Sequence, residues 1–347
     1  MKMKLKPFQK YLKKENIDLA FLVHPDSNIT YFTQMKPSYA HLIITPNSAE
    51  LQLTKLDDHP KIKGIAVKDF QKNWEKNLAD KNTKKVGINK NDLPLKFFEK
   101  LKNLFPKAEF TDISGQLNIL RSQKTEEEAA KITKACQITV DALNNLTGNF
   151  SPKKFKTELD VAFFLEKYIK EQGAELAFPT ISASGKNSAI PHHVTSNTKL
   201  KKGFLQLDFG ASYQNYCADM SRVLHLGTIG KIEKDHYEIL LKAQQEAVIQ
   251  SSLNKPYPEL DKVARKMLGK YSSYFIHSLG HGVGIDVHEQ PSYSPELDNK
   301  ILQGHVFTIE PGIYFPGKYG LRIEDTLIFD KKAKILTKAS KELVILR

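Results

Sequence analysis

The chain contains 347 residues, a length that predicts about two domains with ample hydrophobic core. Its net charge is +13, and lysine provides all but five of its 52 basic residues. Lysines spread along a chain are typical of a solvated surface, and arginine, the better reader of bases, is scarce, so we predict no nucleic-acid partner.

The N-terminal residues are basic, but no apolar run of signal-peptide length follows them. No apolar run elsewhere is long enough to span a bilayer, so no membrane partner is expected. The cysteines, Cys136 and Cys217, lie in different predicted elements and indicate no disulfide framework. We therefore predict a cytoplasmic protein.

The first 118 residues alternate predicted strands and helices, a pattern typical of an α/β domain over residues 1–118. In chain order the predicted elements are a strand at 19–23, a helix around 29–32, a hairpin across 46–48, a strand at 86–88 and a helix at 93–104.

Two amphipathic helices follow, at the start of a second predicted domain over residues 119–347. The first begins at Thr125, whose hydroxyl can cap the helix while Glu128 reaches back to the cap residue. Apolar residues then recur at helical spacing, which indicates a face packed in a core. The second helix is predicted from Thr157 to about residue 172.

Two β-prone segments, 204–210 and 216–224, are joined by polar residues of hairpin-loop length and should pair antiparallel. Asp208 and Asp219 are equidistant from a turn centred between residues 213 and 214. The hairpin is therefore expected to place their carboxylates opposite each other, with Cβ atoms about 5 Å apart.

A second predicted hairpin repeats this arrangement. Glu310 and Glu324 lie symmetrically about Gly317 and should also face each other. In either hairpin, a register slip or a bulge would shift the pairing.

Opposed like charges are destabilising unless something neutralises them, and two divalent cations would balance four carboxylates. An intervening stretch contributes His281 between two glycines. Carboxylate oxygens with one imidazole suit Mn²⁺, Co²⁺, Fe²⁺ or Zn²⁺, and a water between two such ions can become a nucleophile near neutral pH. An aspartate pair alone is more often solvated or salt-bridged, so the metal hypothesis depends on both pairs together with His281.

The stretches LDFGASYQNYCADMSR, SLGHGVGIDVHEQP, TIEPGIY and LRIEDT resemble the motifs of the pita-bread metallopeptidases. They are most similar to those of the Xaa-Pro peptidases, which comprise Xaa-Pro aminopeptidase and prolidase. The resemblance implies an N-terminal creatinase/prolidase-like α/β domain and a C-terminal α+β pita-bread catalytic domain. It also implies a homodimer and two divalent metal ions per chain, with Mn²⁺ or Co²⁺ favoured over Zn²⁺ or Fe²⁺.

The resemblance also implies roles for the five predicted ligands. Asp208 would hold one metal ion, Asp219 and Glu324 would bridge both ions, and His281 and Glu310 would hold the other. Glu310 would also accept a proton from the nucleophilic water.

Two histidines are implied to line the site without binding metal. His192 and His288 would stabilise the tetrahedral intermediate or transfer protons, for which imidazole is suited near pH 7. Isolated histidines are more often surface or core residues, and His193 leaves open which histidine of the adjacent pair faces the metals. Three further residues are implied to surround and orient the proline ring of the substrate: His277, Tyr314 and Arg322.

The predicted function is therefore hydrolysis of the bond between an N-terminal residue and a following proline. An aminopeptidase is preferred over the alternative, prolidase, because no arginine precedes Arg121 to bind a dipeptide carboxylate. A methionine aminopeptidase would leave the N-terminal domain unexplained. The intact ligand set argues against a creatinase-like enzyme and against a binding module without catalysis.

Overall fold

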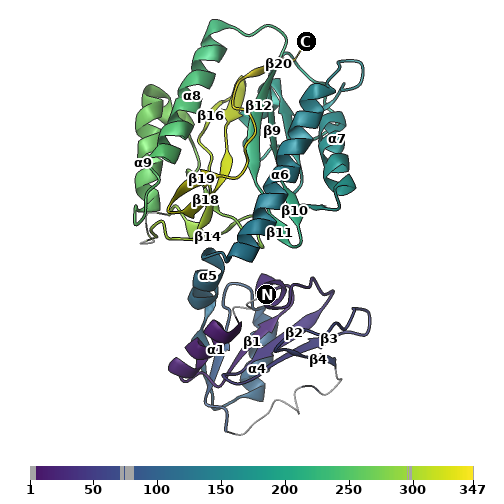
Figure 1. Ribbon diagram of the computed structural model, residues 1–347, viewed down its shortest axis with the longest axis vertical. Helices are drawn as coiled ribbons and strands as arrows, with labels where there is room; N and C mark the ends of the chain where they lie inside the picture. Colours follow the sequence, from purple (N-terminus) through teal and green to yellow (C-terminus); the bar gives the residue numbers. More distant parts are fainter. Residues whose placement is uncertain (1–4, 71–73, 75–81, 295, 297–298, 347) are drawn as a thin grey trace. The chain divides into compact units, whose positions relative to one another are not determined.

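The computed structural model describes residues 5–70, 74, 82–294, 296 and 299–346 (Figure 1). Residues 1–4 of the basic N-terminal segment thus lie outside the described residues. The chain divides into two compact units, Met1–Arg121 and Ser122–Arg347, and the division falls within helix α5 (Ser114–Ser122). Within the described ranges, no helix is long and apolar enough to cross a membrane.

The first unit is built on one mixed β-sheet. Its strands are β1 (Leu19–Val23), β2 (Ala40–Ile44), β3 (Ala49–Leu53), β4 (Ala66–Asp69), β5 (Lys85–Ile88) and β6 (Glu109–Asp112). They lie in the order β4-β3-β2-β1-β5-β6. The β1/β2 and β2/β3 pairs are antiparallel, and the β1/β5, β3/β4 and β5/β6 pairs are parallel.

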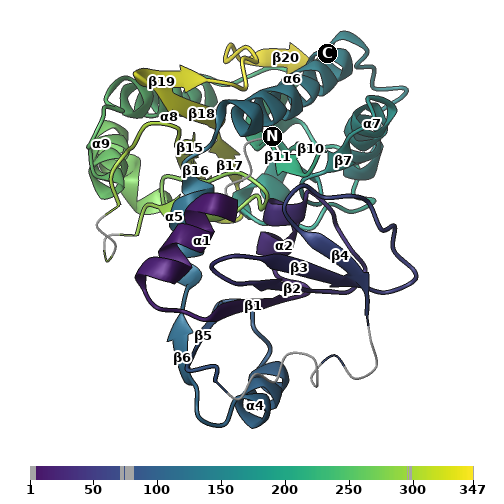
Figure 2. The same cartoon turned by 60° about the horizontal axis from the view of Figure 1, so that its bottom comes forward.

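Helices cover both faces of this sheet, so every residue of β1 is buried. They are α1 (Leu5–Lys14), α2 (Ser27–Thr33) and α4 (Leu95–Leu104). Phe21 of β1 shares a hydrophobic cluster with Leu101 of α4. Figure 2 shows α1 and α2 on the opposite side of the strands from α4. The predicted α/β alternation is confirmed. β4 and β6 were not predicted because none of their residues is buried and they lack an apolar pattern.

In the second unit, strands lie between two pairs of helices (Figure 1). The helices are α6 (Glu126–Gly148), α7 (Glu158–Glu171), α8 (Lys231–Ile249) and α9 (Tyr257–Leu268). A four-stranded sheet has the order β20-β12-β9-β8 and contains β8 (Ile181–Ser184), β9 (Gly203–Phe209), β12 (Met220–Leu226) and β20 (Val344–Leu346).

The other strands complete this unit. A five-stranded sheet, in the order β14-β13-β15-β18-β19, contains β13 (His281–Gly282), β14 (Glu289–Ser292), β15 (Val306–Ile309), β18 (Asp325–Asp330) and β19 (Lys332–Ile335). A three-stranded sheet contains β7 (Glu175–Leu176), β10 (Ala211–Tyr213) and β11 (Tyr216–Cys217), and a hairpin contains β16 (Gly312–Phe315) and β17 (Tyr319–Arg322).

Each helix pair has its own hydrophobic core against the strands. Leu143 of α6 shares one buried cluster with Leu207 of β9, and Leu240 of α8 shares another with Phe307 of β15. The metal-site motifs lie on the strands between these two cores. Packing on both sides therefore supports the strands that carry the candidate ligands.

Both predicted helix starts are confirmed. The Thr125 hydroxyl accepts from the N–H of Glu128, and the Glu128 carboxylate accepts from the N–H of Thr125. Thr157 and Asp160 form the equivalent capping box at the start of α7. Each box satisfies N–H groups that the first helical turn leaves without partners.

Candidate metal centre

The hairpin that carries Asp208 and Asp219 forms, but its register differs from the prediction. In the β9/β12 ladder, Asp208 pairs with Ser221, so the two aspartates are diagonal neighbours. The chain turns at Gln214 and Asn215, whose φ angles of 48° and 70° suit a two-residue hairpin turn. The turn centre therefore lies one residue later than predicted, and the expectation of direct opposition is wrong.

Residues 211–213, which were expected to lie in the loop, instead extend the hairpin as β10, and β10 pairs with β11. The backbones approach closely where β9 ends, because a Cβ on Gly210 would lie 1.8 Å from the carbonyl oxygen of Ala218. The Ala218 N–H donates to the carbonyl of Ala211 at 2.8 Å. A glycine is thus required beside the aspartates, since any side chain there would collide with backbone.

The second hairpin has the predicted register. Ile309 pairs with Asp325 in the β15/β18 ladder, and Gly312 pairs with Arg322 in the β16/β17 ladder. Both ladders are symmetric about Gly317, as predicted. Glu310 and Glu324, between these ladders, therefore come from matching positions on the two arms.

The five predicted ligands come together in two overlapping groups. Asp208, Asp219 and Glu324 form one group, and His281, Glu310 and Glu324 form the other, with the ligand atoms of each group within 4.8 Å of one another. His281 Nε2 lies 3.5 Å from Asp219 Oδ2 and 3.3 Å from Glu310 Oε1. Glu324 belongs to both groups, which is the arrangement expected of a bridging ligand.

The unpaired oxygens of this cluster fit a cation. Asp208 Oδ1, Asp219 Oδ1 and Glu324 Oε1 are buried and have no hydrogen-bond partner among the described residues. Leaving a buried carboxylate oxygen unpaired is unfavourable. Because all three atoms belong to one ligand group, the donor set fits a divalent ion.

The electrostatics of the cluster lead to the same conclusion. Burial raises the pKa of Asp219 well above its usual range, and the charges of Glu324 and Asp208 raise it further. Burial, together with the charges of Glu310 and Asp208, raises the pKa of Glu324 in the same way. Divalent cations would remove the repulsion that causes both shifts.

Glu310 differs from these two carboxylates. Burial alone would raise its pKa, but the hydrogen bond and charge of His281 outweigh burial and hold the pKa at about 2. The Thr308 hydroxyl accepts from the N–H of His281 at 3.1 Å and donates to Glu310 Oε1 at 3.2 Å. One buried hydroxyl thus joins two candidate ligands, which orients both.

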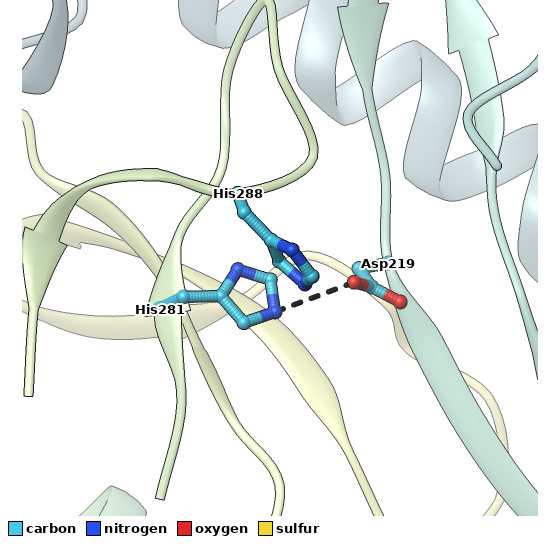
Figure 3. A group of neighbouring side chains, drawn as sticks. All are labelled: Asp219, His281 and His288. Atoms are coloured by element: carbon cyan, nitrogen blue, oxygen red, sulfur yellow. Dashed lines mark ion pairs between the residues drawn. The ribbon is translucent and has the colours of Figure 1, made fainter. Parts of the chain in front are cut away.

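His288 lies beside the cluster on the chain segment that follows β13. Figure 3 shows its ring against that of His281, and the two ring centroids are 4.1 Å apart. His288, His281 and Asp219 form a third group with ligand atoms within 4.8 Å. The geometry therefore places a second imidazole near the candidate metal ligands, and the expectation that His288 does not bind metal stays a prediction.

The adjacent histidines have different surroundings. His193 Nε2 lies 2.9 Å from Glu158 Oε2, and the Glu158 side chain is fully buried. Both histidines line the cavity over the cluster, but His192 is the more exposed and its ring makes no hydrogen bond to the described residues. His192 is therefore the histidine of the pair that is available for chemistry.

The three residues predicted to surround the substrate form a connected network. Arg322 Nη1 donates to Tyr314 Oη at 2.7 Å, and its Nη2 donates to Asp208 Oδ2. His277 Nε2 lies 3.0 Å from Tyr314 Oη. Burial raises the pKa of Tyr314 to about 12, although the charge of Arg322 opposes it. The predicted substrate-binding role of these residues stays a prediction.

A cavity of about 840 Å³ opens above the carboxylates. His277 and Arg322 line it, whereas Tyr314 is not among its described lining residues and contacts both of them. Apolar side chains form much of the remaining wall: Leu159, Ala162, Phe163, Phe178 and Val287.

Several supporting residues were not predicted. The Ser221 hydroxyl donates to Glu324 Oε2 at 3.1 Å and accepts from Arg322 Nε at 2.8 Å. Ser221 and Thr308 each lie two residues from a candidate ligand on the same chain segment. Alternation along a strand places such residues on the ligand face and could have indicated them.

A buried ion pair supports the backbone behind Glu324. Arg222 Nη2 lies 2.7 Å from Asp325 Oδ1, and Arg222 Nη1 donates to the carbonyl of Glu324. Burial would raise the pKa of Asp325, but the charges of Arg222 and Lys341 hold it below its usual range. The sequence indicated none of these pairings because their members lie far apart in the chain.

Comparison with known proteins identifies the family. The model of metallopeptidase family M24 matches residues 130–331, and that of the creatinase/prolidase N-terminal domain matches residues 4–123. The chain belongs to metallopeptidase family M24. The predicted family, the two-domain fold class and a metallo-exopeptidase are thereby confirmed.

Individual relatives cover nearly the whole chain. The chain is 37% identical to an Xaa-Pro dipeptidase of Pyrococcus horikoshii over 352 residues, or 99% of each protein. It resembles the solved prolidase of Pyrococcus horikoshii OT3 with a TM-score of 0.90 and 35% identity, over 98% of this chain and 99% of that one.

An aminopeptidase is also similar in structure. The X-Pro aminopeptidase from Thermotoga maritima gives a TM-score of 0.86 and 29% identity, over 95% of this chain and 98% of that one. The higher identity to Xaa-Pro dipeptidases favours the alternative prediction, prolidase, over the preferred aminopeptidase.

Proposed function

We propose that the chain is an Xaa-Pro dipeptidase that uses two divalent metal ions to hydrolyse dipeptides ending in proline. The observation that carries this proposal is the pair of ligand groups that share Glu324, with three buried carboxylate oxygens lacking partners among the described residues. The identity of 37% to an Xaa-Pro dipeptidase over nearly the full length supports the substrate class.

Asp208, Asp219 and Glu324 would hold one ion, and His281 and Glu310 would hold the other with Asp219 and Glu324 as bridging ligands. Carboxylate oxygens with one imidazole favour Mn²⁺ or Co²⁺, with Zn²⁺ or Fe²⁺ as alternatives. When bound, the ions would act as Lewis acids on the scissile carbonyl and activate the attacking water.

The side chains of the cavity would then move protons and stabilise charge. Glu310 would accept the proton of the attacking water at its carboxylate. Burial lowers the pKa of His288, so its neutral ring could accept a proton near pH 7. His192 would donate a hydrogen bond to the developing oxyanion.

Substrate length is the point on which the two Xaa-Pro activities differ. A dipeptidase needs a cation for the free carboxylate of proline, whereas an aminopeptidase needs space for the next residue. No arginine precedes Arg121, so a lysine or Arg322 would have to provide that charge. We also retain the homodimer as a prediction, which light scattering of the purified protein would test.

The deciding experiment compares Ala-Pro, Ala-Pro-Ala and Met-Ala-Ala as substrates of the metal-reconstituted protein. We expect rapid cleavage of Ala-Pro and little cleavage of the other two. Comparable cleavage of Ala-Pro-Ala would make the chain an Xaa-Pro aminopeptidase, and preference for Met-Ala-Ala would reject both. Asp219→Asn provides the inactive control for contaminating peptidases.

A further inference from the structure

His192 depends on its neighbours for its orientation. Its ring makes no hydrogen bond that the described residues provide, and its side chain is exposed at the cavity. The N–H of His193 donates to the carbonyl of Ile190 at 3.1 Å and closes a tight turn with His192 inside it. The direction of the His192 ring is therefore set by whatever holds this turn.

Glu158 holds one end of the turn. His193 Nε2 lies 2.9 Å from Glu158 Oε2, with only 12% of the His193 side chain exposed and none of Glu158. The other oxygen, Glu158 Oε1, accepts from the N–H of Ser184 at 2.7 Å and from Asn187 Nδ2 at 3.0 Å. The carboxylate oxygen accepts in this contact, and His193 Nε2 donates.

The start of α7 leaves Glu158 free for this contact. Thr157 and Asp160 supply the capping box, so the carboxylate of the first helical residue is not needed for capping. The N-terminal end of a helix also favours a negative charge. Glu158 can therefore bind β8 and His193 with its two carboxylate oxygens.

Arg322 holds the other side of the turn. Its Nη1 lies 3.4 Å from the carbonyl oxygen of Pro191, and its Nη2 donates to the candidate ligand Asp208. The residues on both sides of His192 are thus bound, Pro191 to an arginine that also binds a candidate metal ligand and His193 to a buried carboxylate.

We propose that His193 is a positioning residue: its hydrogen bond to Glu158 fixes the turn so that His192 faces the reacting atoms. The inference rests on the proposed function, because His192 matters only if it contacts the substrate. Loss of the bond would leave Glu158 Oε2 buried without a donor, so the segment would rearrange to satisfy it. His193 would then affect turnover solely through His192.

A double-mutant cycle tests this coupling with Ala-Pro as substrate. His193→Phe keeps a planar ring but removes the donor, and should lower kcat by about tenfold through misplacement of His192. His193→Gln keeps a donor and should recover most of that loss. In the His192→Ala background, His193→Phe should have almost no further effect on kcat.

Metal content and KM should stay close to wild type in these variants. His59→Phe is the matched control, because His59 also pairs with a carboxylate, Asp69 at 3.2 Å, but in the N-terminal unit. An unchanged kcat in His193→Phe would overturn the proposal. So would equal losses in the presence and absence of His192, which would indicate a structural role alone.

Failure of the proposed function gives a different result. Wild-type protein would then bind metal but leave Ala-Pro intact. A crystal structure of His193→Phe still tests the positioning: displacement of residues 190–193 supports it, and an unmoved turn overturns it.

Discussion

The two hairpins of the candidate metal centre use different turns. In the hairpin of Glu310 and Glu324, Gly317 occupies the turn with a φ of 72°. The β15/β18 and β16/β17 ladders, which flank the two glutamates, share one register. The two glutamates therefore lie at matching positions. In the hairpin of Asp208 and Asp219, the aspartates are offset by two residues across the ladder.

This offset has a chemical consequence. The position opposite Asp208 is occupied by Ser221, whose hydroxyl donates to Glu324 and accepts from Arg322. Exact opposition of the aspartates would remove that hydroxyl from the site. The glutamate hairpin therefore supplies its candidate ligands from symmetric positions. The aspartate hairpin supplies a pair of candidate ligands and also Ser221, which orients Glu324 of the other hairpin.

The largest effect is expected from removing one carboxylate of each hairpin. Asp219→Asn and Glu324→Gln should each lower kcat/KM for Ala-Pro by about 10³-fold or more, because bound metal ions contribute several kcal/mol to transition-state stabilisation. Elemental analysis should show less than two ions per chain. The control is Glu171→Gln, which removes the same charge at an exposed position on α7. Full metal content with intact activity would contradict the bridging assignment.

A smaller loss is expected for His288, which lies next to both hairpins. His288→Ala should lower kcat by about 10²-fold, the usual effect of losing a positioned proton donor or acceptor. Metal content should remain near that of the wild type. If metal is lost instead, His288 is a ligand together with Asp219 and His281.

Metal binding should stabilise the folded protein more at pH 8 than at pH 5. The raised pKa values of Asp219 and Glu324 mean that the metal-free folded state binds protons that the unfolded chain releases above about pH 4. Stability of the metal-free protein therefore falls as pH rises. The pKa of Glu310 is lowered instead, to about 2. Its contribution to stability is therefore lost only in the acid range, as pH falls through that pKa.

The measurement is thermal unfolding with a chelator or with Mn²⁺ at both pH values. A metal ion present at a thousand times its Kd stabilises by about 4 kcal/mol. An equal or greater metal-dependent rise in Tm at pH 5 would show that the carboxylates do not repel one another as described.

The orienting hydroxyls should have milder effects. Ser221→Ala and Thr308→Val should each weaken metal binding by about tenfold, because both hydroxyls hold ligands rather than metal. Competition with a chelating dye measures this affinity directly. Ser221→Thr and Thr308→Ser keep the hydroxyl and should restore most of the binding. Equal weakening by the conservative variants would point to packing instead.

The smallest effects belong to the two turns. Gly317→Ala should lower the free energy of unfolding by about 1 kcal/mol, because a Cβ is strained at positive φ. Gln214→Gly should raise it by up to about 1 kcal/mol through relief of the same strain. Chemical denaturation measures both changes, and kcat should not respond. A stabilised Gly317→Ala variant would show that the turn conformation differs from the one described.

Local patterns were sufficient for much of the fold. The capping boxes at Thr125 and Thr157 and the buried strand β1 depend on residues close in sequence, so the sequence predicted them. Edge strands β4 and β6 were missed because few of their side chains are buried and no apolar pattern marks them. The first hairpin was misregistered because two non-glycine residues adopt positive φ, which composition does not indicate.

The sequence by itself predicted the five candidate ligands that the structure brings together, because each lies in a short motif on a strand or turn. Only the tertiary structure decided how these side chains are held, since the contacts of His193 with Glu158 and of Arg322 with Asp208 span 35 and 114 residues. Such pairs are set by the packing of separate elements around two cores. No local pattern encodes them, and a one-residue change in a turn is enough to exchange the partner of an aspartate.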